Sequence, residues 1–65
     1  MKNKFSENLK KLRESKKLTQ KGLAEKLGVT QRKVSYWESG KIEPDLNALM
    51  QIAKYFDFPV DYLLT

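Results

Sequence analysis

Four hydrogen-bonding side chains are close together in the segment GVTQRKVSYWESG, residues 28–40. In a helix each residue advances by about 100° around the axis, so four polar residues would share one arc: Gln31, Arg32, Ser35 and Tyr36. Their amide, guanidinium, hydroxyl and phenol groups can donate or accept hydrogen bonds at a polar surface. We call these four residues the polar face. Val34 and Trp37 fall on the opposite side of the helix and are expected to anchor it to a core.

The hydrogen-bonding groups of the polar face match the edges of DNA bases. The major groove of B-DNA admits one α-helix, and each base pair displays a distinct pattern of donors and acceptors there. Arg32 can make two hydrogen bonds to guanine O6 and N7, and Gln31 can do the same at adenine N6 and N7. Both residues are in the first turn of the expected helix. The alternative is a surface helix with arbitrary polar residues.

Five short helices are expected, and they predict one compact all-α domain over residues 1–65. The first covers about residues 6–16, where apolar residues recur at helical spacing. Three side chains can cap the helices that follow: Thr19, Thr30 and Asp45. Gly28 and Gly40 close the second and third helices, and a last helical turn follows Pro59.

The apolar spacing also predicts which side chains form the core. The first helix contributes Phe5, Leu9 and Leu12, and the second contributes Leu23, Ala24 and Leu27. On the fourth helix, five residues form the expected buried stripe: Leu46, Leu49, Ile52, Ala53 and Phe56.

Charge is distributed unevenly along the chain, whose net charge is +5. Residues 1–41 carry twelve Lys and Arg against four acids, a net charge of +8, whereas residues 42–65 carry one Lys against four acids, a net charge of −3. A strongly basic segment attracts polyanions such as nucleic acids, although lysines also serve simply to solvate helix faces. We expect the basic part to face a polyanion and the acidic end to serve another purpose.

The residue types that are absent exclude several classes of function. The chain has no His and no Cys, so the usual proton shuttle and thiolate nucleophile of enzymes are missing. No carboxylates are grouped as a hydrolase or metal site requires. We expect no catalysis, metal, cofactor or small-molecule ligand. No apolar run approaches the roughly 20 residues of a membrane span, and a cytoplasmic protein without membrane contact is expected.

The segment TQKGLAEKLGVTQRKVSYWESG, residues 19–40, resembles the helix-turn-helix of the phage-repressor and Cro family, also called the xenobiotic-response-element (XRE) family. Ala24, Gly28 and Val34 stand where that family has a small residue, a turn glycine and an apolar β-branched residue. The flanking segments also look like the family's first, fourth and fifth helices. The resemblance implies a lambda-repressor-like domain whose third helix, about residues 31–38, enters the major groove of double-stranded DNA.

The resemblance further implies roles for individual positions. Three residues of the third helix would read bases: Gln31, Arg32 and Tyr36. Six residues would contact phosphates: Gln20, Lys21, Thr30, Lys33, Ser35 and Lys41. Arg13 and Glu38 match a pair that bridges the first and third helices in the family. Six other lysines are interpreted as solubilising: Lys10, Lys11, Lys16, Lys17, Lys26 and Lys54.

Members of this family commonly bind palindromic operators as two-fold dimers, so we expect a homodimer and a repressor of transcription. Residues 57–65 are the candidate dimer contact, because their apolar side chains exceed what one small core is sure to bury: Phe58, Val60, Tyr62, Leu63 and Leu64. These residues are equally expected to close the domain's own core. The alternative function is a protein-interaction module, as in antitoxins or adaptors, with DNA binding secondary.

Two residues depart from the family's pattern. Gly22 stands where a glutamate commonly completes a capping box, so the second helix is expected to fray more readily. Lys17 stands where glycine is common, and a lysine in a left-handed cap would be strained. Neither residue belongs to the polar face, so we expect effects on stability rather than on binding.

Overall fold

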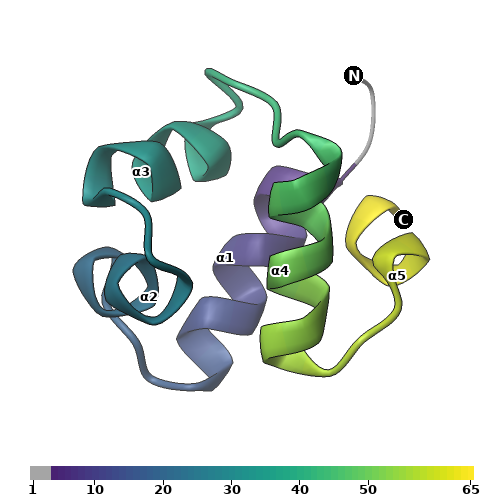
Figure 1. Cartoon of the computed structure of the whole chain (residues 1–65), viewed down its shortest axis with the longest axis horizontal. Coiled ribbons are helices and arrows are strands. Elements are labelled where there is room, and N and C mark those ends of the chain that lie inside the picture. The colour runs from purple at the N-terminus through teal and green to yellow at the C-terminus, as the bar shows by residue number, and fades with distance from the viewer. Residues whose placement is uncertain (1–3) are drawn as a thin grey trace.

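The computed structural model describes residues 4–65, which form five helices (Figure 1). In chain order they are α1 (Phe5–Ser15), α2 (Gln20–Leu27), α3 (Gln31–Ser39), α4 (Leu46–Phe56) and α5 (Val60–Leu64). The expected all-α fold of five short helices is confirmed, with α1 and α3 differing from the predicted bounds by one residue. The start of the expected domain at residue 1 lies outside the described residues.

The helices separate into two sides in Figure 1, with α2 and α3 on the left and α4 and α5 on the right. Helix α1 packs against α3 and α5, and α4 contacts α2 and α5. Within the helix-turn-helix pair, α3 is therefore supported by α1, and α2 is supported by α4. Within residues 4–65, none of the helices has the length and apolarity needed to cross a membrane.

The predicted caps fix where α2, α3 and α4 begin. The side chains of Thr19, Thr30 and Asp45 each accept a hydrogen bond from the backbone N–H three residues later, at 2.8 to 3.1 Å. Helices α2 and α3 end at Gly28 and Gly40, whose φ angles of 72° and 78° lie in the left-handed region that favours glycine. The three-residue connection from Gly28 to Thr30 therefore holds α3 at a defined angle to α2.

Two residues other than glycine also adopt left-handed backbone. Lys17, between α1 and α2, has a φ of 56°, as predicted from its place in the family's pattern. Asp57, which follows the last residue of α4, has a φ of 61° that was not predicted from the sequence. Aspartate tolerates this conformation better than lysine does because its short side chain can hydrogen-bond locally.

The core contains side chains from all five helices: Phe5, Leu9, Leu12, Leu23, Ala24, Leu27, Val34, Trp37, Ala48, Leu49, Ile52, Ala53, Phe56 and Leu63. Trp37 of α3 is only 1% exposed. Val60 and Leu64 pack against this core, whereas Phe58 and Tyr62 are exposed. The C-terminal segment thus closes the core with some of its apolar residues and leaves two of them at the surface.

The predicted core is wrong at Leu46, because this side chain is 66% exposed. The core-facing side of α4 is set by Leu49, Ile52 and Phe56, and Leu46 lies about 90° from its centre at 100° per residue. Ala48 occupies the core position instead. Leu46 joins Met50, one turn further along α4, as an exposed apolar side chain.

Candidate nucleic-acid interface

The polar face lies on the solvent side of α3. Its first two residues are exposed, and its last two, Ser35 and Tyr36, are half-buried. Val34 and Trp37 point into the core behind them. The backbone of α3 is therefore fixed by burial on one side while its hydrogen-bonding side chains remain accessible on the other.

Of the six residues expected to contact phosphates, Lys33 and Ser35 lie within α3 and the other four lie at or beyond helix ends. Gln20 and Lys21 begin α2, Thr30 caps α3, and Lys41 follows the glycine that ends α3. Four of the six are exposed: Lys21, Thr30, Lys33 and Lys41. Gln20 and Ser35 are half-buried.

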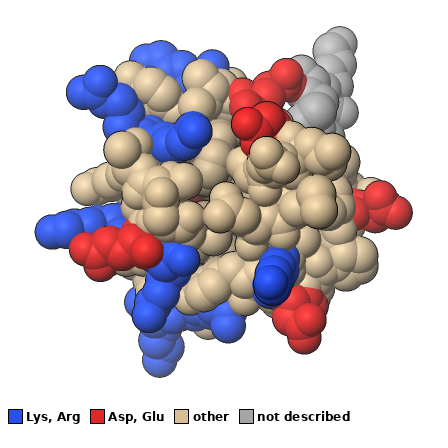
Figure 2. Space-filling model, viewed as in Figure 1, with Lys and Arg blue, Asp and Glu red and all other residues tan. Residues whose placement is uncertain are grey.

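The basic and acidic side chains gather on different sides of the molecule. Figure 2 shows most of the visible Lys and Arg on the left half, over α2 and α3, and most of the acids toward the right, over α4 and α5. The polar face therefore belongs to the basic side. Such a field attracts polyanions and raises their rate of association.

Lys41 lies against a residue of the polar face. Its Nζ is 5.2 Å from the centroid of the Tyr36 ring. The contact follows from the end of α3, because the left-handed Gly40 turns the chain back and the Lys41 N–H donates a hydrogen bond to the Tyr36 carbonyl oxygen at 2.9 Å. This contact was not predicted from the sequence, although the glycine at position 40 is a signal that the chain turns back toward Tyr36.

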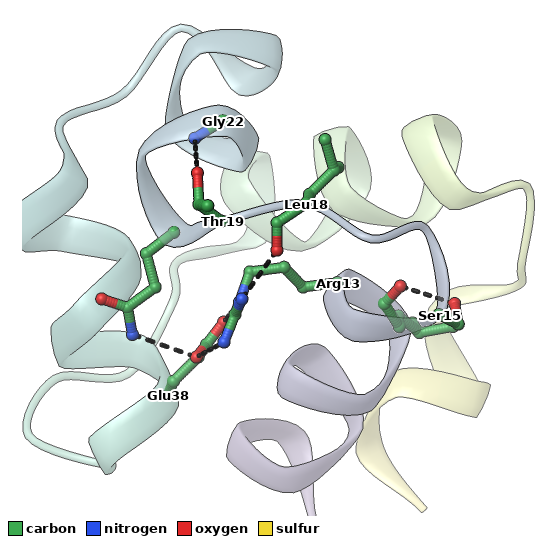
Figure 3. A network of polar contacts seen from close by, with 8 residues as sticks. Arg13, Ser15, Leu18, Thr19, Gly22 and Glu38 are labelled. Carbon is green, nitrogen blue, oxygen red and sulfur yellow. Dashed lines mark hydrogen bonds and ion pairs between the residues drawn. The ribbon is translucent and has the colours of Figure 1, made fainter.

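Arg13 and Glu38 form an ion pair that joins α1 to α3 (Figure 3). Arg13 Nε donates to Glu38 Oε2 at 2.6 Å and Nη2 donates to Oε1 at 3.1 Å, while Nη1 donates to the Leu18 carbonyl oxygen at 2.7 Å. The two side chains are 12% and 4% exposed. Hydrogen bonding to the carboxylate raises the pKa of Arg13 above its usual value, with burial opposing the rise. The guanidinium thus also holds the loop that precedes α2.

Gln20 extends this ion pair to a third helix. Its Nε2 donates to Glu38 Oε1 at 3.1 Å, so both carboxylate oxygens accept hydrogen bonds. For Gln20 the sequence predicted phosphate contact alone, and this bond was not predicted. A glutamine amide has two N–H groups and one carbonyl oxygen, so the bond to Glu38 still leaves one N–H to donate elsewhere.

Ala24 lies within α2, and Gly28 directly follows it. Ala24 is buried in α2, the helix that packs against α3. Gly28 needs its left-handed φ, although a Cβ there would meet nothing within 4 Å. In the part of the chain that the structure describes, no three Asp, Glu, His or Cys residues are grouped to hold a metal ion.

Comparison with known proteins shows that the chain belongs to the helix-turn-helix family. A family model described as helix-turn-helix matches residues 9–63. The chain is 50% identical over 60 residues to the uncharacterized HTH-type transcriptional regulator YqaE of Bacillus subtilis, covering 92% of this chain and 52% of YqaE. It is 46% identical over 61 residues to the HTH-type transcriptional activator BcrR of Enterococcus faecalis, covering 94% and 30%. The chain therefore spans about half the length of YqaE and less of BcrR.

Solved structures share this fold in two different settings. The P22 c2 repressor in complex with a synthetic operator matches with a TM-score of 0.87 and 30% identity, over 94% of this chain and 92% of that chain. Hydroxypropylphosphonic acid epoxidase from S. wedmorenis matches with a TM-score of 0.85 and 34% identity, over 97% and 34%. The same fold thus forms nearly all of one chain and a third of an enzyme.

Proposed function

Because the chain belongs to the helix-turn-helix family of phage repressors and Cro, we propose that it binds double-stranded DNA with sequence specificity and regulates transcription. The observation that carries this proposal is the polar face of α3, which is accessible, lies on the basic side of the molecule and is backed by the buried Trp37. Helix α3 enters the major groove. The similarity to an operator-bound repressor over nearly its whole length supports this orientation.

Three side chains of the polar face read base edges: Gln31, Arg32 and Tyr36. Arg32 suits the two acceptors of guanine and Gln31 suits the donor and acceptor of adenine. Each bidentate pair contributes about 1 to 3 kcal/mol of discrimination against the wrong base. Their fixed backbone supports affinity, because a helix that is already ordered loses little conformational freedom on binding.

Six residues contact phosphates and set the register of α3: Gln20, Lys21, Thr30, Lys33, Ser35 and Lys41. Gln20 and Lys21 begin α2, Thr30 and Lys41 flank α3, and Lys33 and Ser35 lie within α3. Together they would meet backbone on either side of the groove. Such contacts supply affinity without sequence information.

The protein acts as a two-fold dimer on a palindromic operator and represses transcription by occupying it. Support for a dimer contact comes from four exposed apolar side chains, which we call the apolar patch: Leu46, Met50, Phe58 and Tyr62. Met50 lies one turn after Leu46 on α4, and Met50 and Phe58 line the same hollow. The rings of Phe58 and Tyr62 are stacked, with centroids 4.6 Å apart. We therefore extend the expected contact in residues 57–65 to the exposed side of α4.

The proposed unit is the whole chain, residues 1–65, acting as one binding domain. No catalytic activity is proposed for it, since a DNA-reading surface accounts for its accessible polar groups. Because its partner is DNA, we place the protein in the cytoplasm.

The experiment that tests this function is selection of bound duplexes from a random pool, followed by titration at several salt concentrations. We expect the selected duplex to bind about 10³-fold or more tightly than a random one. The logarithm of the binding constant should fall linearly with the logarithm of salt concentration, by about 0.9 per phosphate neutralised. Equal affinity for both duplexes would contradict this function and favour the alternative, a protein-interaction module.

A further inference from the structure

A polar hollow lies where α1, α2 and α3 meet, lined by Lys10, Arg13, Gln20, Ser35, Glu38 and Ser39. It adjoins the polar face, because Ser35 belongs to both. We propose that this hollow binds one phosphate group of the DNA backbone and that Lys10 supplies the cation for it. The proposal rests on the proposed function and assigns a binding role to a lysine whose sequence context indicated only solubility.

The charge of the hollow favours an anion. Glu38 would repel a phosphate if it were free, but both of its oxygens accept hydrogen bonds, and the Arg13 guanidinium neutralises its charge. Lys10 is exposed and takes part in no ion pair within residues 4–65. The three charged side chains of the hollow therefore sum to +1, and Lys10 is the cation that remains unpaired.

Hydrogen-bond donors are also present in the hollow. Gln20 keeps one amide N–H beyond the bond that it gives to Glu38. The Ser35 hydroxyl is half-buried on α3 and offers a second donor. Phosphate oxygens in protein–DNA complexes are commonly bound by this combination of lysine, amide and hydroxyl.

The position of the hollow distinguishes Lys10 from the other lysines of α1. A DNA strand whose bases face Gln31 and Arg32 must carry its backbone past the edge of α3. Glu38, which lines the hollow and lies about 20° beyond Gln31 around the helix, places the hollow at that edge. Lys11 is adjacent to Lys10 in sequence and equally exposed, but it does not line the hollow. It is therefore a matched control with the same change in charge.

The first experiment compares Lys10→Met with Lys11→Met in binding the selected duplex between about 50 and 200 mM salt. For Lys10→Met we expect the magnitude of the salt slope to fall by about 0.9, with affinity about 5- to 10-fold lower near 0.1 M salt. Lys11→Met should keep the wild-type slope. If Lys10→Met also keeps it while the wild type binds specifically, the hollow binds no phosphate and only this inference fails.

A second experiment identifies the phosphate. Neutral methylphosphonate linkages are introduced one at a time into the selected duplex. One substitution should weaken the wild type by the same factor as Lys10→Met does, and should not weaken the Lys10→Met variant further. If every methylphosphonate linkage weakens binding of Lys10→Met by the same factor as binding of the wild type, the assignment is wrong. A wild-type protein that showed no sequence preference would overturn the proposed function as well.

Free phosphate has the same chemistry as the backbone group, so a third measurement separates them. Thermal unfolding is followed in inorganic phosphate and in chloride at equal ionic strength. Equal stabilisation of the wild type and Lys10→Met is expected if the hollow requires DNA. A rise in Tm that is specific to phosphate and lost in Lys10→Met, together with an unchanged DNA salt slope, would assign the hollow to a free anion instead.

Discussion

The ammonium group of Lys41 lies 5.2 Å from the centroid of the Tyr36 ring, just beyond the end of α3. A cation at this distance is attracted to the face of an aromatic ring by about 0.5 to 1 kcal/mol at an exposed site. The contact joins a residue proposed to grip phosphate to one proposed to read a base. Affinity and specificity are therefore expected to be coupled at this end of α3.

Replacing the Lys41 cation should reveal that coupling. Lys41→Met is expected to weaken binding to all duplexes and, in addition, to reduce discrimination at the base pair read by Tyr36 by about 2- to 5-fold, the equivalent of the lost cation–π contact. Affinities for the selected duplex and its single-base-pair variants measure both effects. Lys33→Met, which lies near Trp37 rather than Tyr36, should weaken binding without changing preference. If Lys41→Met weakens binding to all duplexes by the same factor, as is expected of Lys33→Met, then Lys41 contacts phosphate alone.

Arg32 should contribute to sequence preference, whereas Lys21 should contribute to affinity for any DNA sequence. Arg32→Ala is expected to relax preference at one base position by about 1 to 3 kcal/mol and to leave the fold intact, because Arg32 is exposed. Lys21→Ala should weaken all sequences alike and reduce the salt slope by about one unit. Binding profiles across sequence variants and salt concentrations separate the two. If the profiles coincide, the division into base-reading and phosphate-contacting residues is wrong.

Truncation of Trp37 should remove most of the stability of so small a domain. Trp37→Ala is expected to cost about 3 to 5 kcal/mol of unfolding free energy, measured by urea denaturation. The indole Nε1 has no hydrogen-bond partner within residues 4–65, so Trp37→Phe loses volume but no hydrogen bond and should cost less than half as much. Similar losses in both variants would indicate a role for the indole N–H that the packing does not explain.

Glycine at position 17 should stabilise the protein. Lys17 adopts left-handed backbone, which costs an L-residue about 1 to 2 kcal/mol, whereas glycine adopts it freely. Glycine also loses more conformational entropy on folding, which offsets part of this gain. Lys17→Gly is therefore expected to raise the free energy of unfolding by about 0.5 to 1 kcal/mol, measured by thermal or urea unfolding. The neighbouring Lys16 has a φ of −95°, so Lys16→Gly should destabilise. Two losses of equal size would show that strain at Lys17 is negligible.

Removing the exposed apolar patch should affect assembly and leave folding unchanged. Leu46 and Met50 are 66% and 55% exposed, so a Leu46→Gln, Met50→Gln double variant should keep the unfolding free energy of the wild type. If the patch is the dimer contact, sedimentation with the selected duplex will show two wild-type chains per palindrome and weaker pairing of the variant. A wild type that stays monomeric on DNA would end the dimer proposal.

The helix boundaries could be predicted because their signals are local. Thr19, Thr30 and Asp45 act within one helical turn of their own position, and Gly28 and Gly40 act through their own φ. Such effects need no knowledge of the rest of the molecule. The sequence therefore predicted the five-helix fold and the exposure of the polar face.

What the sequence did not predict depends on the relative placement of helices. Leu46 fits the apolar spacing of α4, but its exposure is decided by the direction in which α4 faces its neighbours. The bond from Gln20 to Glu38 joins side chains 18 residues apart in sequence. Spacing along one helix indicates the edge on which Glu38 lies, but it does not identify which residues of other helices reach it.

The burial of Trp37 also gives the protein an intrinsic optical probe. This indole is the only one in the chain, and it lies directly beneath the surface that we propose meets DNA. Its fluorescence should report unfolding without any label, because solvent reaches the ring only when α3 leaves the core. Docking of a duplex on the opposite side of α3 should leave the emission maximum nearly unchanged, so a large red shift during titration would reveal that the helix had been displaced.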